Sequence, residues 1–288
     1  MPAARTGSAA RERRSRREPE ERKPRRRSDL LQRILVAIPL AVATIIFIDL
    51  GGLPYALFMI AAGLICMHEL YRLLDRWRPV PFVGFVALVA LVLAARADGR
   101  GGVLLVAVAA VPVVLLAVII RDQPRPTVAI AGTLLGIYWI GLAFAHTELL
   151  RQLHHGNSVM IDVLVGTFIG DTGAYIGGRL FGRRPLAARI SPNKTVEGLF
   201  CGMFAAVLAV FIAGLYQTWL TQGKALELGL AVAVLGPLGD LFESVVKRDA
   251  GAKDAGTLLG SHGGFLDRLD GALFTVVVGY YIWLSVVH

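Results

Sequence analysis

The stretch SVVKRDAGAKDAGTLLGSHGGFLDRLD, residues 244–270, separates two long apolar segments near the end of the chain. It contains four basic residues, four aspartates and a His-Gly-Gly sequence. An ionised side chain costs about 2.5 kcal/mol or more at the centre of a bilayer. A polar block of this density, joined directly to segments apolar enough for lipid, therefore indicates a functional site.

The rest of the chain has the composition of an integral membrane protein. Of its 288 residues 55% are hydrophobic, and the mean hydropathy is +0.62. Its two cysteines fall inside apolar segments, as expected for small buried hydrophobic residues, and say nothing about a disulfide framework. Nine apolar runs are long enough to span a bilayer, at roughly 31–50, 53–74, 80–97, 102–120, 128–149, 158–181, 196–219, 225–247 and 265–287. We therefore predict an all-α, polytopic membrane protein with about nine transmembrane helices.

Three regions follow from this pattern. Residues 1–33 hold twelve Lys/Arg against five Asp/Glu, a net charge of +7 out of +9 for the chain. The basic balance thus belongs to a tail rather than to a nucleic-acid-binding surface, and no nucleic acid partner is expected. We predict a disordered basic cytoplasmic tail over 1–30, N-terminal transmembrane helices over 31–160 and a catalytic transmembrane region over 161–288. The tail could attract anionic lipid headgroups or serve as a solvated topology signal.

The distribution of basic residues predicts the orientation. With the N-terminus in the cytoplasm, the inside loops after the tail carry fourteen Lys/Arg and the outside loops carry four. This bias agrees with the positive-inside rule for nine spans taken in sequence. The frequent Arg, Ala, Val and Gly indicate a GC-rich bacterial genome. We therefore expect a multi-pass protein of the bacterial inner (plasma) membrane with a cytoplasmic N-terminus.

Four aspartates meet at one depth in this topology. Asp171 lies about thirteen residues into the sixth segment, Asp240 about fifteen into the eighth, and Asp267 and Asp270 in the first turns of the ninth. At about 1.5 Å per residue, all four fall in the cytoplasmic half of the membrane. The depth of these carboxylates predicts a single shared cavity that opens to the cytoplasm.

Spacing along the helices supports this cavity. Asp240, Ser244 and Lys247 occupy one helical stripe, whereas Glu243 and Arg248 fall off it. We expect Gly236-Pro237 to kink or locally unwind the eighth segment beside the cavity. The glycines that surround Asp171 should allow another helix or a ligand to approach closely; they are Gly170, Gly173, Gly177 and Gly178.

The chemistry of these residues predicts a metal and phosphate groups. Converging carboxylates without a His or Cys cluster favour a hard cation, Mg²⁺ first. Beside them stand cations that suit phosphate oxygens, namely Lys194, Lys247, Arg248, Lys253 and Arg268. The loop Gly260–Gly264 should offer backbone N–H groups at a helix start, and we expect Ser191-Pro192 to begin the seventh segment. Carboxylates that can bind a metal, next to Lys and Arg side chains that can bind phosphate groups, indicate phosphoryl or nucleotidyl transfer.

Two alternatives stay open at this stage. Intramembrane Asp–Lys and Asp–Arg pairs could neutralise each other, or could mark the ion pathway of a transporter. Glu69, with His68 at the inner end of the second segment, could join the site or form an interfacial pair.

The motifs of the C-terminal half resemble the phosphatidate cytidylyltransferases, or CDP-diacylglycerol synthases. The matching patterns are S-x-V-K-R-x4-K-D-x-G…H-G-G-x-x-D-R-x-D at residues 244–270, G-D-L-x-E-S at 239–244, D-x-G-A-Y…G…F-G-R at 171–183 and S-P-N-K-T-x-E-G at 191–198. The chain departs from the family pattern at Gly260-Ser261, where Pro-Gly is expected, and at Gly271, where Ser is common. The resemblance covers roughly residues 165–271 and includes every charged position of the motifs.

The resemblance implies the reaction CTP + phosphatidate → CDP-diacylglycerol + pyrophosphate, dependent on Mg²⁺, with a second cation possible. It also implies membrane lipids as surroundings and a homodimer. The expected catalytic residues are Asp240, Lys247, Asp267 and Asp270, and the expected metal ligands are Asp171, Asp240, Asp267 and Asp270. The expected substrate-binding residues are Lys194, Ser244, Arg248, Lys253, His262, Gly263, Gly264 and Arg268.

Overall fold

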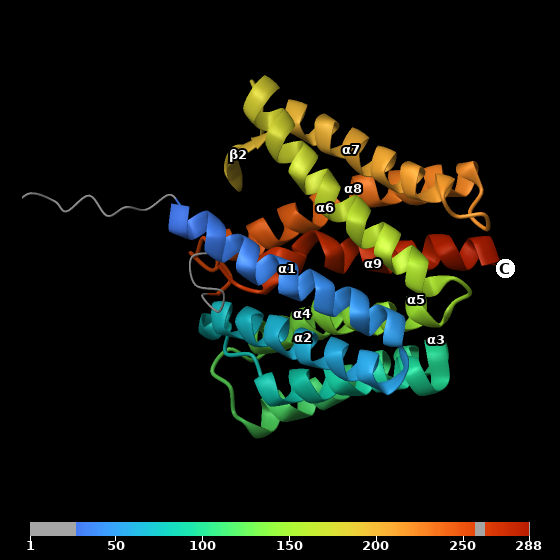
Figure 1. The fold of residues 1–288 in the computed structure, drawn as a ribbon. Helices are drawn as coiled ribbons and strands as arrows, with labels where there is room; N and C mark the ends of the chain where they lie inside the picture. The colour runs from blue at the N-terminus through green and yellow to red at the C-terminus, as the bar shows by residue number, and fades with distance from the viewer. Residues whose placement is uncertain (1–26, 257–262, 288) are drawn as a thin grey trace, which may run out of the picture. The chain divides into compact units, whose positions relative to one another are not determined.

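The computed structural model describes residues 27–256 and 263–287 (Figure 1). The chain divides into two units, residues 1–38 and 39–288, and the elements discussed below belong to the second, except for the first part of α1. The predicted tail over 1–30 lies outside the described residues, apart from residues 27–30 at the start of α1. The proposed boundary between the transmembrane regions at residue 160 stays a prediction.

The described residues are almost entirely helical, which confirms the all-α prediction. The elements are α1 (Arg27–Leu50), α2 (Gly52–Leu73), the 3₁₀ turn η2 (Asp75–Trp77), α3 (Pro81–Ile120), α4 (Pro126–Leu135), the π-helical turn η3 (Gly136–Gly141), α5 (Leu142–Gln152), α6 (Gly156–Phe181), β1 (Pro185–Ala187), β2 (Ser191–Thr195), α7 (Val196–Leu215), α8 (Gln222–Asp249) and α9 (Leu266–Val287). Proline opens α3 and α4 at the first turn, where its missing N–H is not needed.

Seven helices within the described residues are long and apolar enough to cross a membrane, which confirms a polytopic membrane protein but does not establish the count of nine. The helix α3 is counted once, although its backbone is non-helical at Gly99. Val80 N donates a hydrogen bond to Thr133 near one end of the α4–α5 segment, and Ala95 O accepts one from Gln152 at the other end. Further along α3, Ala107 O accepts a hydrogen bond from Tyr138, which lies between Thr133 and Gln152. The chain therefore reverses direction at Gly99, and α3 consists of two antiparallel halves.

Large apolar side chains cover much of the surface of these helices. Leu105 is 70% exposed, Ile120 73% and Phe204 69%. A water-facing surface of this kind would promote association, whereas hydrocarbon solvates it without cost. The distribution of exposed side chains agrees with helices that face lipid.

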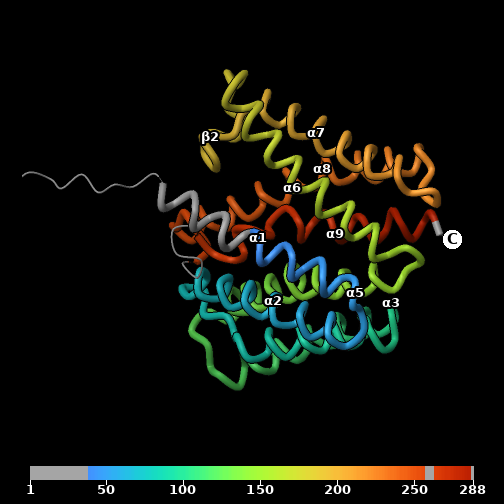
Figure 2. The backbone as a smooth tube through the Cα atoms, in the orientation of Figure 1, coloured from blue at the N-terminus to red at the C-terminus, as the bar shows by residue number. Residues whose placement is uncertain are grey.

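The helix α9 connects the two groups of helices that contain the functional residues. It contacts α2 and α5 on one side and α6 and α8 on the other (Figures 1 and 2). The helices α6 and α7 pack closely because glycines line their contact, as predicted for the glycines near Asp171. A Cβ atom on Gly173 would lie 2.6 Å from the Cβ of Ala205. This close packing fixes the position of Asp171, between Gly170 and Gly173, level with Gly202 and Ala206 near the middle of α7.

One local prediction is wrong, and of the kink or local unwinding predicted for the eighth segment only the unwinding is contradicted. Ser191-Pro192 does not begin α7, because Ser191–Thr195 forms a strand that pairs antiparallel with Pro185–Ala187. The helix begins after Thr195, whose hydroxyl accepts a hydrogen bond from Gly198 N at 3.1 Å and so caps it. Similarly, α8 is not unwound at Gly236-Pro237, since it is helical from Gln222 to Asp249.

Candidate active site

A cavity of about 710 Å³ collects the charged residues of the C-terminal half. The helix α6 contributes Asp171, strand β2 contributes Lys194, and α8 contributes Asp240 and Lys247. The first turns of α9 contribute Asp267, Arg268 and Asp270. The four aspartates predicted to lie at one depth thus line one cavity, although they are separated by up to about a hundred residues of sequence.

Asp240 and Lys194 form one charged pair in this cavity. Both side chains are about one third exposed or less, and their charged groups are in contact. Asp171 interacts electrostatically with both of them, and Asp270 interacts with Asp240 and Asp171. Three carboxylates therefore share the region around a single lysine, which leaves a local excess of negative charge.

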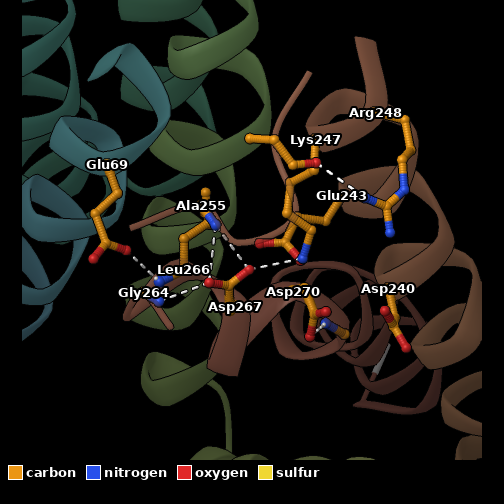
Figure 3. Close-up of polar contacts among 12 residues, drawn as sticks. Glu69, Asp240, Glu243, Lys247, Arg248, Ala255, Gly264, Leu266, Asp267 and Asp270 are labelled. Carbon is orange, nitrogen blue, oxygen red and sulfur yellow. Dashed lines mark hydrogen bonds and ion pairs between the residues drawn. The ribbon is translucent and has the colours of Figure 1, made fainter. Parts of the chain in front are cut away.

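Lys247 lies between two further carboxylates (Figure 3). Its Nζ donates to Glu243 Oε2 at 2.5 Å and to Asp267 Oδ1 at 2.7 Å. The Glu243 side chain is fully buried, and those of Lys247 and Asp267 are only 12% and 10% exposed. Lys247 therefore serves as the counter-ion that allows two acids to be buried together.

Asp267 holds the loop that precedes α9. Its oxygens accept hydrogen bonds from Ala255 N at 3.0–3.1 Å and from Gly264 N at 2.6 Å, in addition to Lys247 (Figure 3). Gly263 has a φ of 78°, and a Cβ atom there would lie 2.7 Å from Asp267 Oδ2. Glycine at 263 is thus required by backbone conformation and by the carboxylate beside it.

Several predicted substrate-binding residues do not line the cavity. Arg248 is exposed and donates to the carbonyls of Ile190 and Ala252, so that it ties the β-hairpin to the end of α8. Lys253 is also exposed. Ser244 is not part of the cavity wall, and Gly264 gives its N–H to Asp267. His262 lies outside the described residues, as do Gly260 and Ser261.

The cavity also contains polar residues that the sequence reasoning did not single out as ligands. These are Tyr175, Arg179, Ser191, Asn193 and Asp254. Arg179 lies two helical turns after Asp171 on α6, a spacing that could have drawn attention to it. Asn193 lies in the unpredicted strand next to Lys194, so its direction could not be inferred from a helical pattern.

The donor set suits a hard cation. Among the described residues, no three His, Cys, Asp or Glu side chains already form a metal-binding cluster. The cavity wall nevertheless offers the carboxylate oxygens of Asp171, Asp240 and Asp270, with excess negative charge around them. Oxygen ligands of this kind fit Mg²⁺. Asp267 stays a predicted fourth ligand, although its oxygens already accept hydrogen bonds from three donors.

Comparison with known proteins shows the family of this chain. The model of the cytidylyltransferase family matches residues 31–286. The chain belongs to this family. It is 31% identical over 264 residues to a phosphatidate cytidylyltransferase of Bacillus subtilis, covering 88% of this chain and 97% of the relative. It is 30% identical over 258 residues to one of Staphylococcus epidermidis, covering 85% and 95%. A Mycobacterium leprae enzyme of the same name is 41% identical over 147 residues, covering 49% of this chain and 46% of the relative.

Membership of the cytidylyltransferase family confirms the resemblance and extends it. The quoted motifs cover roughly residues 165–271, whereas the family match begins at residue 31 and so includes α2 to α5. The family match therefore covers most of the N-terminal half as well as the motifs. The structure shows how this half reaches the charged site.

Glu69, in the N-terminal half of the chain, contacts the charged stretch of residues 244–270. Its side chain is 5% exposed, and Oε2 accepts a hydrogen bond from Leu266 N at 2.8 Å (Figure 3). Gly256 and Gly264 pack against the carboxylate, since a Cβ on either would lie 2.5 Å from a Glu69 oxygen. The interfacial pair with His68 is therefore the wrong alternative for Glu69. This residue joins the site as a support for the first turn of α9.

Replacing Glu69 with Ala should loosen this support. The buried Leu266 N–H would lose its acceptor, at a cost of about 1–3 kcal/mol. We expect lower thermal stability in detergent and roughly tenfold lower cytidylyl transfer. Glu69→Gln retains an oxygen acceptor and should recover most of both, whereas Glu227→Ala at an exposed position serves as the matched control. Equal behaviour of the Ala and Gln variants would contradict the role of the acceptor oxygen.

Proposed function

We propose that this protein transfers CMP from CTP to phosphatidate, giving CDP-diacylglycerol and pyrophosphate. The observation that carries the proposal is the single cavity in which Asp171, Asp240 and Asp270 stand beside Lys194 and Lys247. Such a cavity can neutralise two polyanionic substrates and hold them together. Membership of the cytidylyltransferase family and the names of the relatives support this reaction.

The reaction demands positioning more than proton transfer. A phosphate monoester carries between one and two negative charges near neutral pH, so its oxygen is already a nucleophile. It attacks the α-phosphorus of CTP and forms a new P–O bond, while the bond from that phosphorus to the bridging oxygen breaks. The electron pair of the broken bond leaves with pyrophosphate. Bringing the two anions into line accounts for most of the required catalysis.

The cavity residues divide these tasks. We propose that Asp171, Asp240 and Asp270 hold Mg²⁺, with Asp267 as the further predicted ligand. When bound, the cation neutralises charge on the triphosphate oxygens. Lys194 pairs with Asp240, and it could bind a substrate phosphate instead when a cation binds the Asp240 carboxylate. Arg268 lines the same cavity wall. Lys247 pairs with Asp267 and Glu243 and keeps both carboxylates in place. Its role is to position these acids, and it does not act on the substrate by itself.

We further propose that the cavity opens to the cytoplasm of a bacterial inner membrane and that the N-terminus lies on the same side. The excess of Lys/Arg in the loops of that side supports this orientation. The bacterial relatives support a bacterial membrane. A cytoplasmic opening also suits a soluble nucleotide and a lipid that enters from the adjacent leaflet. We also propose a homodimer, which is what the family resemblance implies.

An assay of the purified protein tests the reaction. With CTP, phosphatidate and Mg²⁺, we expect CDP-diacylglycerol and pyrophosphate in equal amounts, and no product after chelation of the metal. Asp240→Asn or Asp270→Asn should reduce the rate by about 100-fold or more, because a ligand that stabilises charge is worth several kcal/mol. Asp249→Asn, at an exposed position outside the cavity wall, is the matched control.

The same assay distinguishes the alternatives. A transporter would carry a solute across vesicles without releasing pyrophosphate. A related lipid cytidylyltransferase or CTP-dependent lipid kinase would prefer an isoprenoid-ether or free-alcohol acceptor over phosphatidate. Full activity in both the Asp240 and Asp270 variants would disprove the metal assignment while leaving the reaction intact.

A further inference from the structure

A second cavity, of about 1070 Å³, lies between α2 and the first half of α3. Its walls along most of its length are apolar, with Leu64 and Ile65 from α2 facing Phe85 and Val89 from α3. The residues at its two ends on α3 are exposed, Phe82 by 69% and Leu93 by 42%. This groove is therefore open along the surface of the helices.

The length of the groove matches one leaflet of a bilayer. Phe82 and Leu93 are eleven residues apart in one helix, which corresponds to about 16 Å. Half of the hydrocarbon core of a bilayer is about 15 Å thick. An apolar slot of this length and depth suits an acyl chain that extends from the headgroup region to the bilayer midplane.

Polar residues occur at one end of the groove. His68 and Arg72 line that end and are exposed. Among the described residues, Arg72 has no hydrogen-bond or ion-pair partner. An unpaired guanidinium at the end of an apolar slot is complementary to a lipid phosphate, which it can bind through two parallel hydrogen bonds.

The polar end of the groove adjoins the charged cavity. Ala255 and Gly256 form part of its wall, and Ala255 N bonds Asp267 on the other side. Glu69 lines the groove as well and bonds Leu266, the residue before Asp267. One short segment of backbone therefore separates the groove from the site of transfer.

We propose that this groove docks the acceptor lipid before transfer, with one acyl chain of phosphatidate between α2 and α3 and its phosphate first at Arg72 and His68, from where the phosphate passes into the charged cavity. This inference rests on the proposed function for the identity of the lipid. It assigns the N-terminal helices, which the signature motifs do not cover, to recognition of the acceptor.

Filling the groove tests the proposal. Ala90 lies in its wall, and Ala90→Phe should raise the KM for dioleoyl phosphatidate by about tenfold, through loss of a few buried methylene contacts. The KM for short-chain dihexanoyl phosphatidate and the KM for CTP should stay within twofold. Ala109→Phe, on the exposed surface of the second half of α3, is the matched control and should behave like the unmodified protein.

A second variant tests the polar end. Arg72→Gln should raise the KM for both phosphatidates by about tenfold, because the phosphate contact does not depend on chain length. Retention of dioleoyl phosphatidate, measured by native mass spectrometry without CTP, should fall in both Ala90→Phe and Arg72→Gln. This readout does not require turnover.

The outcomes separate the two proposals. If the unmodified protein forms no CDP-diacylglycerol but its phosphatidate retention depends on Ala90 and Arg72, the proposed reaction fails and the groove assignment stands. If turnover occurs but both variants match Ala109→Phe, the groove assignment is overturned. Equal retention of phosphatidylcholine would indicate that the groove holds a structural lipid. A change of oligomeric state in Ala90→Phe would indicate that a second copy of the chain occupies the groove. Either result overturns the proposal.

Discussion

Replacing Lys247 with Met should lower both the stability of the protein and its activity more than any other single change of a charged residue. The ammonium group donates to Glu243 at 2.5 Å and to Asp267 at 2.7 Å, in surroundings where Glu243 has no exposed surface. Without it, two carboxylates face each other away from water. Removing one partner of a buried ion pair costs about 3–5 kcal/mol.

The loss of activity follows from the position of Asp267. Its carboxylate holds the N–H groups of Ala255 and Gly264, so that repulsion from Glu243 would displace the loop before α9. We expect about 1000-fold lower kcat/KM, since misplacing groups by about 1 Å costs about 100-fold and a charge is lost as well. Thermal unfolding in detergent and steady-state kinetics measure the two effects.

A double variant separates the two contributions. In Lys247→Met/Glu243→Gln, the uncompensated buried charge is removed, so much of the lost stability should return. Activity should stay low, because Asp267 still lacks its cationic partner. Lys224→Met is the matched control, since within the described part of the chain Lys224, at the other end of α8, donates only to the carbonyl of Val286. Wild-type stability in the single Lys247 variant would show that water reaches the pair, contrary to its burial.

Helical periodicity explains why part of this site could be predicted. The helical stripe predicts Asp240, Ser244 and Lys247 on the cavity side of α8; Asp240 and Lys247 line the cavity, whereas Ser244 does not. Glu243 falls off this stripe. Glu243 is the i−4 neighbour of Lys247, and it is buried on the side of α8 that faces the core. A prediction from one stripe assumes that a helix has a single polar face. The helix α8 instead has two, one that lines the cavity and one that buries Glu243.

Contacts between distant segments could not be predicted in the same way. Glu69 and Leu266 are separated by 197 residues, and their hydrogen bond depends on how α2 packs against α9. The hairpin at Pro185–Thr195 depends on a pairing of two very short strands, neither of which has a clear alternating pattern. The turn in α3 occurs at Gly99, between the predicted segments 80–97 and 102–120, where the backbone adopts a positive φ of 60° that glycine accepts readily.

Replacing Gly239 with Ala should misalign α8 and α9, the two helices that carry the proposed metal ligands Asp240 and Asp270. A Cβ atom at 239 would lie 2.6 Å from the carbonyl oxygen of Asp270 and 3.1 Å from the Cα of Gly271. Both are backbone atoms and cannot move aside by a change of rotamer. The helices α8 and α9 must therefore separate, which also increases the distance between Asp240 and Asp270.

We expect kcat to fall by about 100-fold, because displacing catalytic groups by about 1 Å has an effect of that size. Overpacking should reduce stability by only about 1–3 kcal/mol. Steady-state kinetics over a range of Mg²⁺ concentrations should show a higher metal requirement, since the carboxylates would no longer meet at one ion. That shift distinguishes misalignment of the site from general destabilisation.

Two further glycines make the comparison specific. A Cβ on Gly223, in the first turn of the same helix, would meet no atom within 4 Å, so Gly223→Ala should retain full activity. A Cβ on Gly271 would lie 3.3 Å from Gly236 O and from Thr167 Cγ2, so Gly271→Ala should have an intermediate effect and remain folded. Graded loss in the order Gly223, Gly271, Gly239 would show that helix separation controls the rate. Unchanged kcat and Mg²⁺ requirement in Gly239→Ala would show instead that Asp240 and Asp270 do not act on a common ion.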